Sequence, residues 1–235
     1  MAVPAPTGGW RVATVREVAH PMPRFVMLRL AVPDRVDHLP GQHYVVRLTA
    51  PDGYTAQHSY SIASAPGDPL IELAVERLDD GEVSGYLADV VEPGDQLEVR
   101  GPIGGWFVWR TDTPAVGVAG GSGVVPFLAM LRHARDVGAA DLLRLAVSAR
   151  TRDELLYADE LTDAGAVIAL TRTNSSAGSR PPGRLTGGDI LPLVTPGATG
   201  YVCGSAAFAE AGSILLMAAG MPAESIRVER FGPTS

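Results

Sequence analysis

The chain has 235 residues, 46% of them hydrophobic and 19% charged, which suits two domains of ordinary size or one large one and argues against disorder. The formal net charge of -7 argues against non-specific binding to nucleic acid or to an anionic membrane. All 19 basic residues are arginines, which excludes a Schiff-base or Walker-type lysine, and the single cysteine, Cys203, excludes an intrachain disulfide, a cysteine-rich zinc site and a cysteine-ligated iron–sulfur cluster.

Residues 1–9, rich in Pro and Gly, have neither a basic start nor an apolar run, so we expect a flexible tail and not a secretory signal. Together with the lone cysteine, this fits a cytoplasmic protein. The longest uncharged stretch, Thr113–Leu131, approaches the length of a membrane span, but central glycines and Pro126 interrupt it. We interpret it as strand, loop and helix, and expect no membrane association.

Residues 10–111 are predicted to form a β domain. Short runs with β-branched residues and partial alternation are separated by turn residues such as Pro40–Gly41 and Pro93–Asp95. Six such strands indicate an antiparallel barrel or sandwich. The predicted strands are 11–20, 25–32, 43–50, 57–64, 70–78 and 96–101, with one helix at Ser84–Val91.

Residues 112–235 change to alternating strands and helices, which predicts a parallel sheet with helices on both faces. A polar stretch near 110–114 marks the boundary between the two domains. Residues 173–188, rich in Ser, Gly and Pro, are predicted to form a long loop. The predicted strands are 115–120, 142–149, 166–172, 200–204 and 225–231, and the predicted helices are 124–138, 153–165 and 206–220.

A glycine-rich segment, Gly120-Gly121-Ser122-Gly123 with Pro126, lies between a buried-type strand and an amphipathic helix. Glycines let the backbone approach a ligand closely, and a helix N-terminus offers free N–H groups to a pyrophosphate. The segment lacks the G-x-G-x-x-G spacing, so a plain turn is an equal alternative when the motif is taken alone.

Two segments of the β domain combine polar groups with an aromatic ring or a helix start. Residues 58–64, HSYSIAS, place Tyr60 between two serines on a strand, which suits a flat ring ligand, although a half-solvated strand is the alternative. Gly81–Ser84 opens the predicted helix, where Ser84 is either part of an anion site or a plain N-cap.

The ends of two strands in the second domain also carry candidate residues. Cys203–Gly204 closes a strand of the parallel sheet, at the edge where ligands of such sheets bind. A buried cysteine that packs as a small hydrophobe is the alternative. Glu229 and Phe231 lie in the last strand.

Taken together, these segments resemble one family, the ferredoxin–NADP⁺ reductase-like flavoproteins. The resemblance runs from about Trp10 to Gly232 in the family's order. It implies a six-stranded antiparallel β-barrel that binds flavin and a C-terminal α/β domain with a parallel sheet that binds the nicotinamide coenzyme. The matching segments are SYSIAS, GEVSGYL, GDQLEVRGPIGGWF, GGSGVVPFLAMLR, SARTRDELLY, YVCG and VERFG.

The resemblance implies roles for the flavin-binding residues. Tyr60 would pack on the isoalloxazine ring, and Ser61 would hydrogen-bond its reactive nitrogen. The family's phosphate-binding Arg is replaced by His58, which carries only a partial charge near neutrality, so phosphate affinity is expected to be lower or pH-dependent unless the start of the helix contributes more. FAD is preferred to FMN because GEVSGYL and GPIGGW look like the FAD-binding variant. The implied flavin-binding residues are His58, Ser59, Tyr60, Ser61, Ile62, Ala63, Gly81, Val83, Ser84 and Phe231.

The resemblance also implies the coenzyme site. Phe231 would cover the flavin face opposite Tyr60, Cys203 would lie beside the nicotinamide, and Glu229 would relay a proton, so the implied catalytic residues are Ser61, Cys203, Glu229 and Phe231. NADPH is favoured over NADH because three arginines follow the second and third strands, where the 2′-phosphate would lie. Only Arg172 and Arg184 discriminate between the coenzymes, because NADH-using relatives also carry an Arg near the Arg150 position. The alternative is that both are solvated loop residues, and Asp153 is close enough to serve NADH. The implied coenzyme-binding residues are Gly120, Gly121, Ser122, Gly123, Pro126, Arg150, Arg172, Arg184, Cys203 and Gly204.

The predicted function is hydride transfer from NAD(P)H to FAD, followed by electron transfer to an external acceptor: a ferredoxin, a flavodoxin, a monooxygenase component, or a small acceptor such as a quinone or oxygen. No metal is expected, and no iron–sulfur domain, since the chain stops four residues after Phe231. Two alternatives stay open. One is a flavin-binding regulatory subunit without turnover of its own, and the other is an unliganded interaction module whose glycine-rich loops are only turns.

Overall fold

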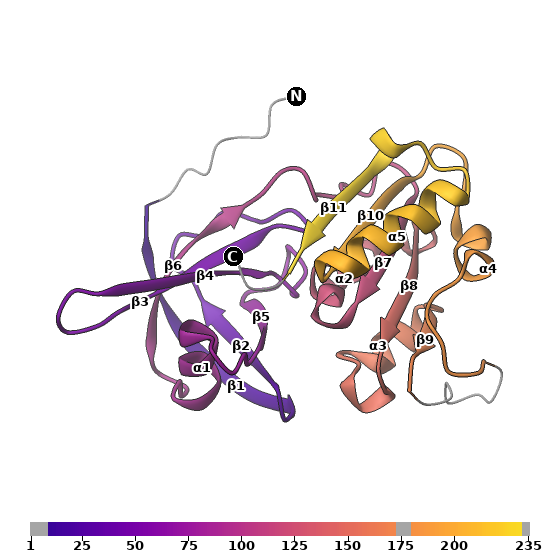
Figure 1. Cartoon of the computed structure of the whole chain (residues 1–235). Coiled ribbons are helices and arrows are strands. Elements are labelled where there is room, and N and C mark those ends of the chain that lie inside the picture. Colours follow the sequence, from indigo (N-terminus) through magenta and orange to yellow (C-terminus); the bar gives the residue numbers. More distant parts are fainter. Residues whose placement is uncertain (1–8, 173–179, 232–235) are drawn as a thin grey trace. The chain divides into compact units, whose positions relative to one another are not determined.

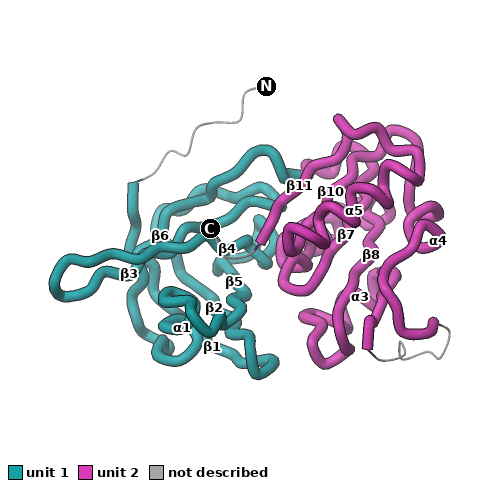
Figure 2. The backbone as a smooth tube through the Cα atoms, viewed as in Figure 1, with its two compact units in different colours: residues 1–108 teal, residues 109–235 magenta. Residues whose placement is uncertain are grey.

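The computed structural model describes residues 9–172 and 180–231 (Figure 1). Most of the predicted tail, residues 1–8, and the segment 173–179 of the predicted loop lie outside the described residues. The chain divides into two compact units, residues 1–108 and 109–235 (Figure 2). The division falls three residues before the boundary predicted between residues 111 and 112.

The N-terminal unit is a six-stranded antiparallel sheet with the strand order β4-β3-β6-β1-β2-β5. Its edge strands meet at a bridge between Ile62 and Leu73, and the Ala63 N–H donates to the Glu72 carbonyl at 2.8 Å. The sheet therefore closes on itself, which confirms the predicted barrel and not the sandwich. The strands are β1 (Arg11–Met22), β2 (Phe25–Ala31), β3 (His43–Thr49), β4 (Thr55–Ser61), β5 (Ile71–Glu76) and β6 (Gln96–Ile103).

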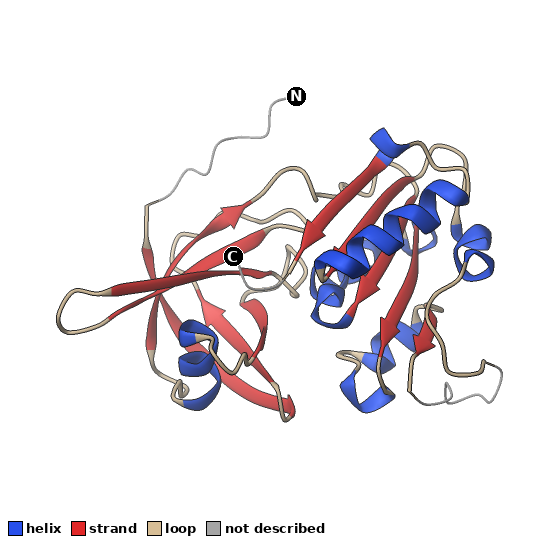
Figure 3. Cartoon of the chain, viewed as in Figure 1, coloured by secondary structure: helices blue, strands red, loops and turns tan. Residues whose placement is uncertain are grey.

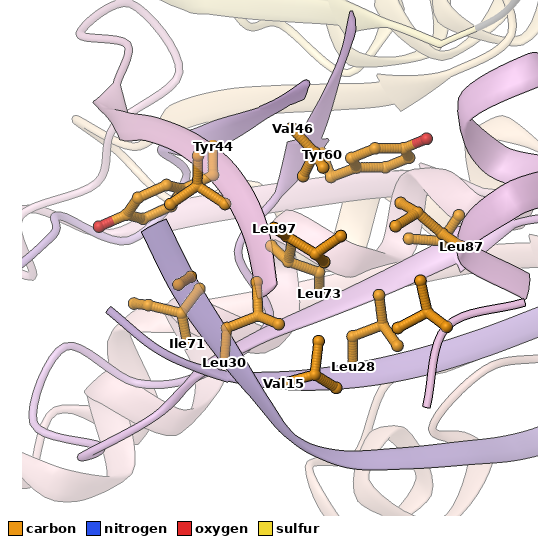
Figure 4. Packing of buried hydrophobic residues seen from close by; sticks show 14 of the residues in the cluster. Val15, Leu28, Leu30, Tyr44, Val46, Tyr60, Ile71, Leu73, Leu87 and Leu97 are labelled. Carbon is orange, nitrogen blue, oxygen red and sulfur yellow. The ribbon is translucent and has the colours of Figure 1, made fainter. Parts of the chain in front are cut away.

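Alternation along the strands builds the barrel core. In β2, Val26, Leu28 and Leu30 are fully buried while the residues between them are half-buried, as a strand with one inward face requires. Figure 4 shows Leu28 and Leu30 among the side chains of this core. Helix α1 (Glu82–Asp89) adds Val83 and Leu87 to this core. The helix begins two residues earlier than predicted.

The C-terminal unit is a parallel sheet of five strands in the order β11-β10-β7-β8-β9 (Figure 1). Figure 3 shows its strands in red and its helices in blue. The chain runs outward from β7 in one direction, then returns to add β10 and β11 on the other side, so the order reverses between β7 and β10. The strands are β7 (Ala115–Gly120), β8 (Leu143–Ala149), β9 (Val167–Leu170), β10 (Thr199–Gly204) and β11 (Ile226–Arg230), and the helices are α2 (Val125–Asp136), α3 (Ala158–Asp163), α4 (Gly187–Ile190) and α5 (Ala206–Ala218).

Helices cover both faces of this sheet. Val116 and Val118 of β7 join the core cluster that contains Leu216 of α5. On the opposite face, a Cβ built on Gly117 would lie 2.6 Å from the Phe127 ring of α2. Alternate residues of one strand thus face different helices, which confirms the predicted α/β arrangement.

Two predicted elements differ from the structure. The helix predicted at 153–165 is reduced to α3, because Tyr157 adopts a left-handed conformation with φ of 56° and separates α3 from a 3-10 turn at Arg152–Glu154. The described end of the predicted loop contains the start of α4. None of the helices within the described ranges is long and apolar enough to cross a membrane.

Candidate active site

The end of β4 carries two buried hydroxyl groups. Tyr60 is 7% exposed and Ser61 is 5% exposed, and neither hydroxyl has a hydrogen-bond partner in the described part of the chain. A buried hydroxyl without a partner is costly, so a ligand that supplied one would stabilise this part of the barrel. These two groups therefore fit the flavin-binding role, in which Ser61 hydrogen-bonds the ring.

The Tyr60 ring belongs to the barrel core, near Leu87 of α1 (Figure 4). Little of this ring is left for a ligand to cover in the structure as it stands. Substituting Tyr60 by alanine would consequently remove core packing as well as any stacking surface. Stacking by Tyr60 stays a prediction whose test has to separate these two effects.

A residue that the sequence analysis did not single out, His43, lies directly opposite Ser61 in the pairing of β3 with β4. The Ile62 N–H donates to the Gln42 carbonyl at 3.1 Å, so the pair at the next position, His43 with Ser61, is the non-hydrogen-bonded kind in which side chains come closest. Burial lowers the pKa of His43. No sequence signal marks this residue, because strand register is a tertiary property.

His58 is two residues before Tyr60 on the same face of β4, and their ring centroids are 5.1 Å apart. Although the residue is exposed overall, partial burial of its ring lowers the pKa from the usual 6.5. His58 is therefore uncharged at neutral pH and does not reproduce the permanent charge of the family's arginine. Ser59 is exposed, and Ile62 and Ala63 are fully buried.

In the turn before α1, the Ser84 hydroxyl, a predicted part of an anion site, forms hydrogen bonds within the turn itself. The Ser84 hydroxyl accepts from the Leu78 N–H and donates to the Gly81 carbonyl, both at 3.2 Å. A Cβ on Gly81 would lie 2.2 Å from this hydroxyl oxygen, so the turn requires glycine. What this helix can offer a phosphate is then the backbone N–H groups of Val83 and Ser84, which have no acceptor within the helix.

The glycine-rich segment lies where the strand order reverses, between the carboxyl ends of β7 and β10. A Cβ on Gly123 would lie 2.3 Å from the Cys203 carbonyl oxygen, and Cβ atoms on Gly120 and Gly204 would lie 2.6 and 2.8 Å from the Phe208 ring. The loop, η1 (Gly121–Val124), can approach β10 this closely only because Gly123 has no side chain. It leads into α2, with Pro126 in the first turn and Ser122 half-buried beside it.

Three further predicted residues come together at the ends of β10 and β11. Cys203 is paired in register with Glu229, and the Phe231 N–H donates to the Gly204 carbonyl at 2.9 Å. Burial raises the pKa of the Cys203 thiol well above its usual value, so it is a neutral thiol. Burial also raises the pKa of Glu229 to about 7, and its Oε2 is buried with no partner in the described residues. Glu229 is thus poised to hold or release a proton near neutrality.

The three predicted phosphate-binding arginines share one edge of this unit. The Arg172 N–H donates to the Arg150 carbonyl at 2.9 Å, and the Gly183 N–H donates to the Leu170 carbonyl at 2.9 Å, which brings Arg184 to the end of β9. Arg172 and Arg184 are exposed, and Arg150 lies 3.8 Å from Glu154. Their positions suit a phosphate that binds beyond β8 and β9.

Comparison with known proteins agrees with these features. Residues 10–108, nearly the whole N-terminal unit, match the oxidoreductase FAD-binding domain family. Both units together match the FAD/NAD-binding domain of nitric oxide dioxygenase from Vibrio cholerae, with a TM-score of 0.81 and 24% identity over 95% of this chain and 99% of that one. In its N-terminal sequence and in its fold, the chain therefore resembles the ferredoxin–NADP⁺ reductase-like flavoproteins.

Curated relatives of this chain are components of oxygenase systems. The ferredoxin–NAD(P)⁺ reductase component of the naphthalene 1,2-dioxygenase/salicylate 5-hydroxylase systems of Ralstonia sp is 27% identical over 95% of this chain. The electron transfer component of 2-halobenzoate 1,2-dioxygenase from Burkholderia cepacia is 27% identical over 85%. The chain spans 68% of the length of the first relative and 60% of the second.

Proposed function

We propose that this flavoprotein takes hydride from NAD(P)H onto FAD and passes the electrons to an external acceptor protein. The observation that carries the proposal is the pairing of an FAD-binding barrel with a parallel sheet whose point of strand reversal is lined by glycine backbone. When bound, FAD supplies the ability to take up two electrons and release them singly or together.

The protein's own residues mainly bind and orient. The Ser61 hydroxyl donates or accepts a hydrogen bond at the flavin ring, and the glycine-rich loop holds the coenzyme pyrophosphate against backbone N–H groups. Cys203, a neutral buried thiol, fixes the position of the nicotinamide by packing. Glu229 holds a proton near neutral pH. In this proposal Phe231 shields one face of the flavin ring.

NADPH is the proposed coenzyme, with Arg172 and Arg184 as the residues that recognise its 2′-phosphate. Two guanidinium groups can each form a charge-assisted hydrogen bond to this phosphate, worth about 1.5–3 kcal/mol. The acceptor is proposed to be a ferredoxin, a flavodoxin or a monooxygenase component, since the relatives are reductase and electron transfer components. A cytoplasmic location follows within this proposal from the supply of NAD(P)H.

The direct test is turnover of the purified protein loaded with FAD, followed as NADPH and NADH oxidation with ferricyanide as acceptor. Oxidation at a catalytic rate supports a reductase, whereas stable FAD binding without turnover supports a regulatory subunit. A preparation that cannot be reconstituted with FAD would leave only an interaction module.

The flavin contact is tested by Ser61→Ala. Because the Ser61 hydroxyl has no partner in the described structure, the substitution should leave the stability of the flavin-free protein unchanged or slightly raised. FAD affinity should fall by about 0.5–1.5 kcal/mol, the value of one hydrogen bond. Thr55→Ala, which removes an exposed hydroxyl from the other end of β4, is the matched control and should change neither quantity.

A further inference from the structure

The outer surface of α1 combines exposed apolar side chains with a concentration of negative charge. Residues 76–95 contain seven acidic residues and one arginine, a net charge of -6 in a chain whose total is -7. Within this segment, Tyr86 is 42% exposed and Val90 is 54% exposed. The rest of the chain therefore carries a net charge of only -1.

The apolar residues lie together on one face of the helix. Tyr86 and Val90 are four residues apart, as Glu82 and Tyr86 are, so all three side chains point outward in a row. Tyr54, 57% exposed, extends this row, since its hydroxyl donates to the Glu82 carboxylate at 3.0 Å. The result is a small apolar strip formed from two separate parts of the barrel.

The acidic residues around the strip are mostly unneutralised. Arg77, the one cation of the segment, is held by Asp89 at 2.9 Å and by Asp79 at 3.7 Å. Asp80 and Glu92 are exposed and form no ion pair with any described residue. An apolar centre with a charged rim is the usual anatomy of a transient protein interface.

The strip lies one helix away from the flavin-binding residues. Leu87, on the inner face of α1, belongs to the same core cluster as Tyr60. An α-helix with its side chains is about 10–12 Å across, so a protein bound to the outer face would come within about that distance of the residues that hold the flavin. An electron acceptor docked there would lie close to the bound flavin.

We propose that the outer face of α1, centred on Tyr54, Tyr86 and Val90 with Asp80, Glu82 and Glu92 around it, docks the basic face of an electron-acceptor protein. That the partner is an electron acceptor rests on the proposed reductase function. That its docking face is basic rests on charge complementarity with the acidic residues of this surface. Negative charge here attracts a positive face and speeds its association, and it repels an acidic carrier. The docking face of the acceptor is therefore basic, with an apolar contact at its centre.

The test uses oxidised horse cytochrome c, a strongly basic redox protein, as the probe. Its binding to the full-length, FAD-loaded protein is measured by calorimetry at low ionic strength, and its reduction by NAD(P)H is followed anaerobically. The variant Asp80→Asn/Glu92→Gln should weaken binding and lower kcat/KM for cytochrome c about fivefold, with a weaker dependence on salt. The variant Tyr86→Ser/Val90→Ser should weaken binding at low and high salt alike, because its effect is not electrostatic.

The matched control is Asp136→Asn/Asp141→Asn, which changes the charge equally at two exposed positions of the C-terminal unit. It should bind cytochrome c as the wild type does, and ferricyanide reduction should be unchanged in every variant. Equal binding by the wild type and the Asp80/Glu92 variant, or an equal loss in the control, overturns the docking surface. If the wild type binds cytochrome c but oxidises no NAD(P)H with ferricyanide, the reductase function is overturned. The docking surface is then tested by the binding of the variants alone.

Discussion

Replacing Gly123 by alanine should be among the most damaging small substitutions in the C-terminal unit. The added Cβ would lie 2.3 Å from the Cys203 oxygen, 2.5 Å from its carbonyl carbon and 2.7 Å from the Gly204 nitrogen. All three atoms belong to the backbone of β10, so no side-chain rotation relieves the overlap. The loop and the strand must separate, at a cost of about 3 kcal/mol, the upper part of the usual range for overpacking.

This cost corresponds to a decrease in Tm of about 6–12 °C for a chain of 235 residues. Differential scanning calorimetry with and without NADPH measures it, and coenzyme affinity should fall as well because the loop carries the pyrophosphate. Gly121→Ala is the matched control: its φ is +57° but nothing lies within 4 Å of the added atom, so only about 1 kcal/mol of backbone strain is expected. If Gly123→Ala is no more destabilising than Gly121→Ala, the close approach of loop and strand is not what makes glycine necessary.

Three further predictions concern charge. Arg172→Ala should raise the apparent KM for NADPH at least tenfold, the equivalent of about 1.4 kcal/mol, and leave the apparent KM for NADH nearly unaffected. Arg144→Ala removes an exposed arginine near the start of β8 and should affect neither constant. An equal loss of affinity for both coenzymes in Arg172→Ala would contradict the phosphate role. His58→Arg should bind FAD more tightly at pH 8, since the lowered pKa leaves His58 uncharged there while arginine stays charged; weaker binding in a fluorescence titration would place His58 away from the phosphate. Glu229 is protonated more readily in the folded protein than in the unfolded chain, so its contribution to stability is present below about pH 4.5 and is lost as pH rises toward 7. The free energy of unfolding in urea should show this decline in the wild type relative to Glu229→Gln. Parallel pH profiles of the two proteins would argue against a raised pKa.

The sequence by itself determined the kind of every β-strand and of most helices, and the position of the glycine-rich loop. Alternation in β2 and strand–helix alternation after residue 112 are local patterns, and each reports which face of an element is buried. The family motifs are also local, which is why the residues at the ends of β4, β7 and β10 could be named. Local patterning failed at Tyr157, where a left-handed residue interrupts a segment whose spacing predicts one continuous helix.

Only the tertiary structure decided which of these residues meet. The pairing of His43 with Ser61, the bridge between Ile62 and Leu73 that closes the barrel, and the approach of Gly123 to Cys203 join segments that no sequence spacing relates. The same holds for the Ser84 hydroxyl, which bonds within the turn before α1, and for the burial of Tyr60. The physical reason is that side-chain periodicity depends on the backbone of one element, whereas strand register, hydrogen-bond partners and burial depend on the elements packed around it.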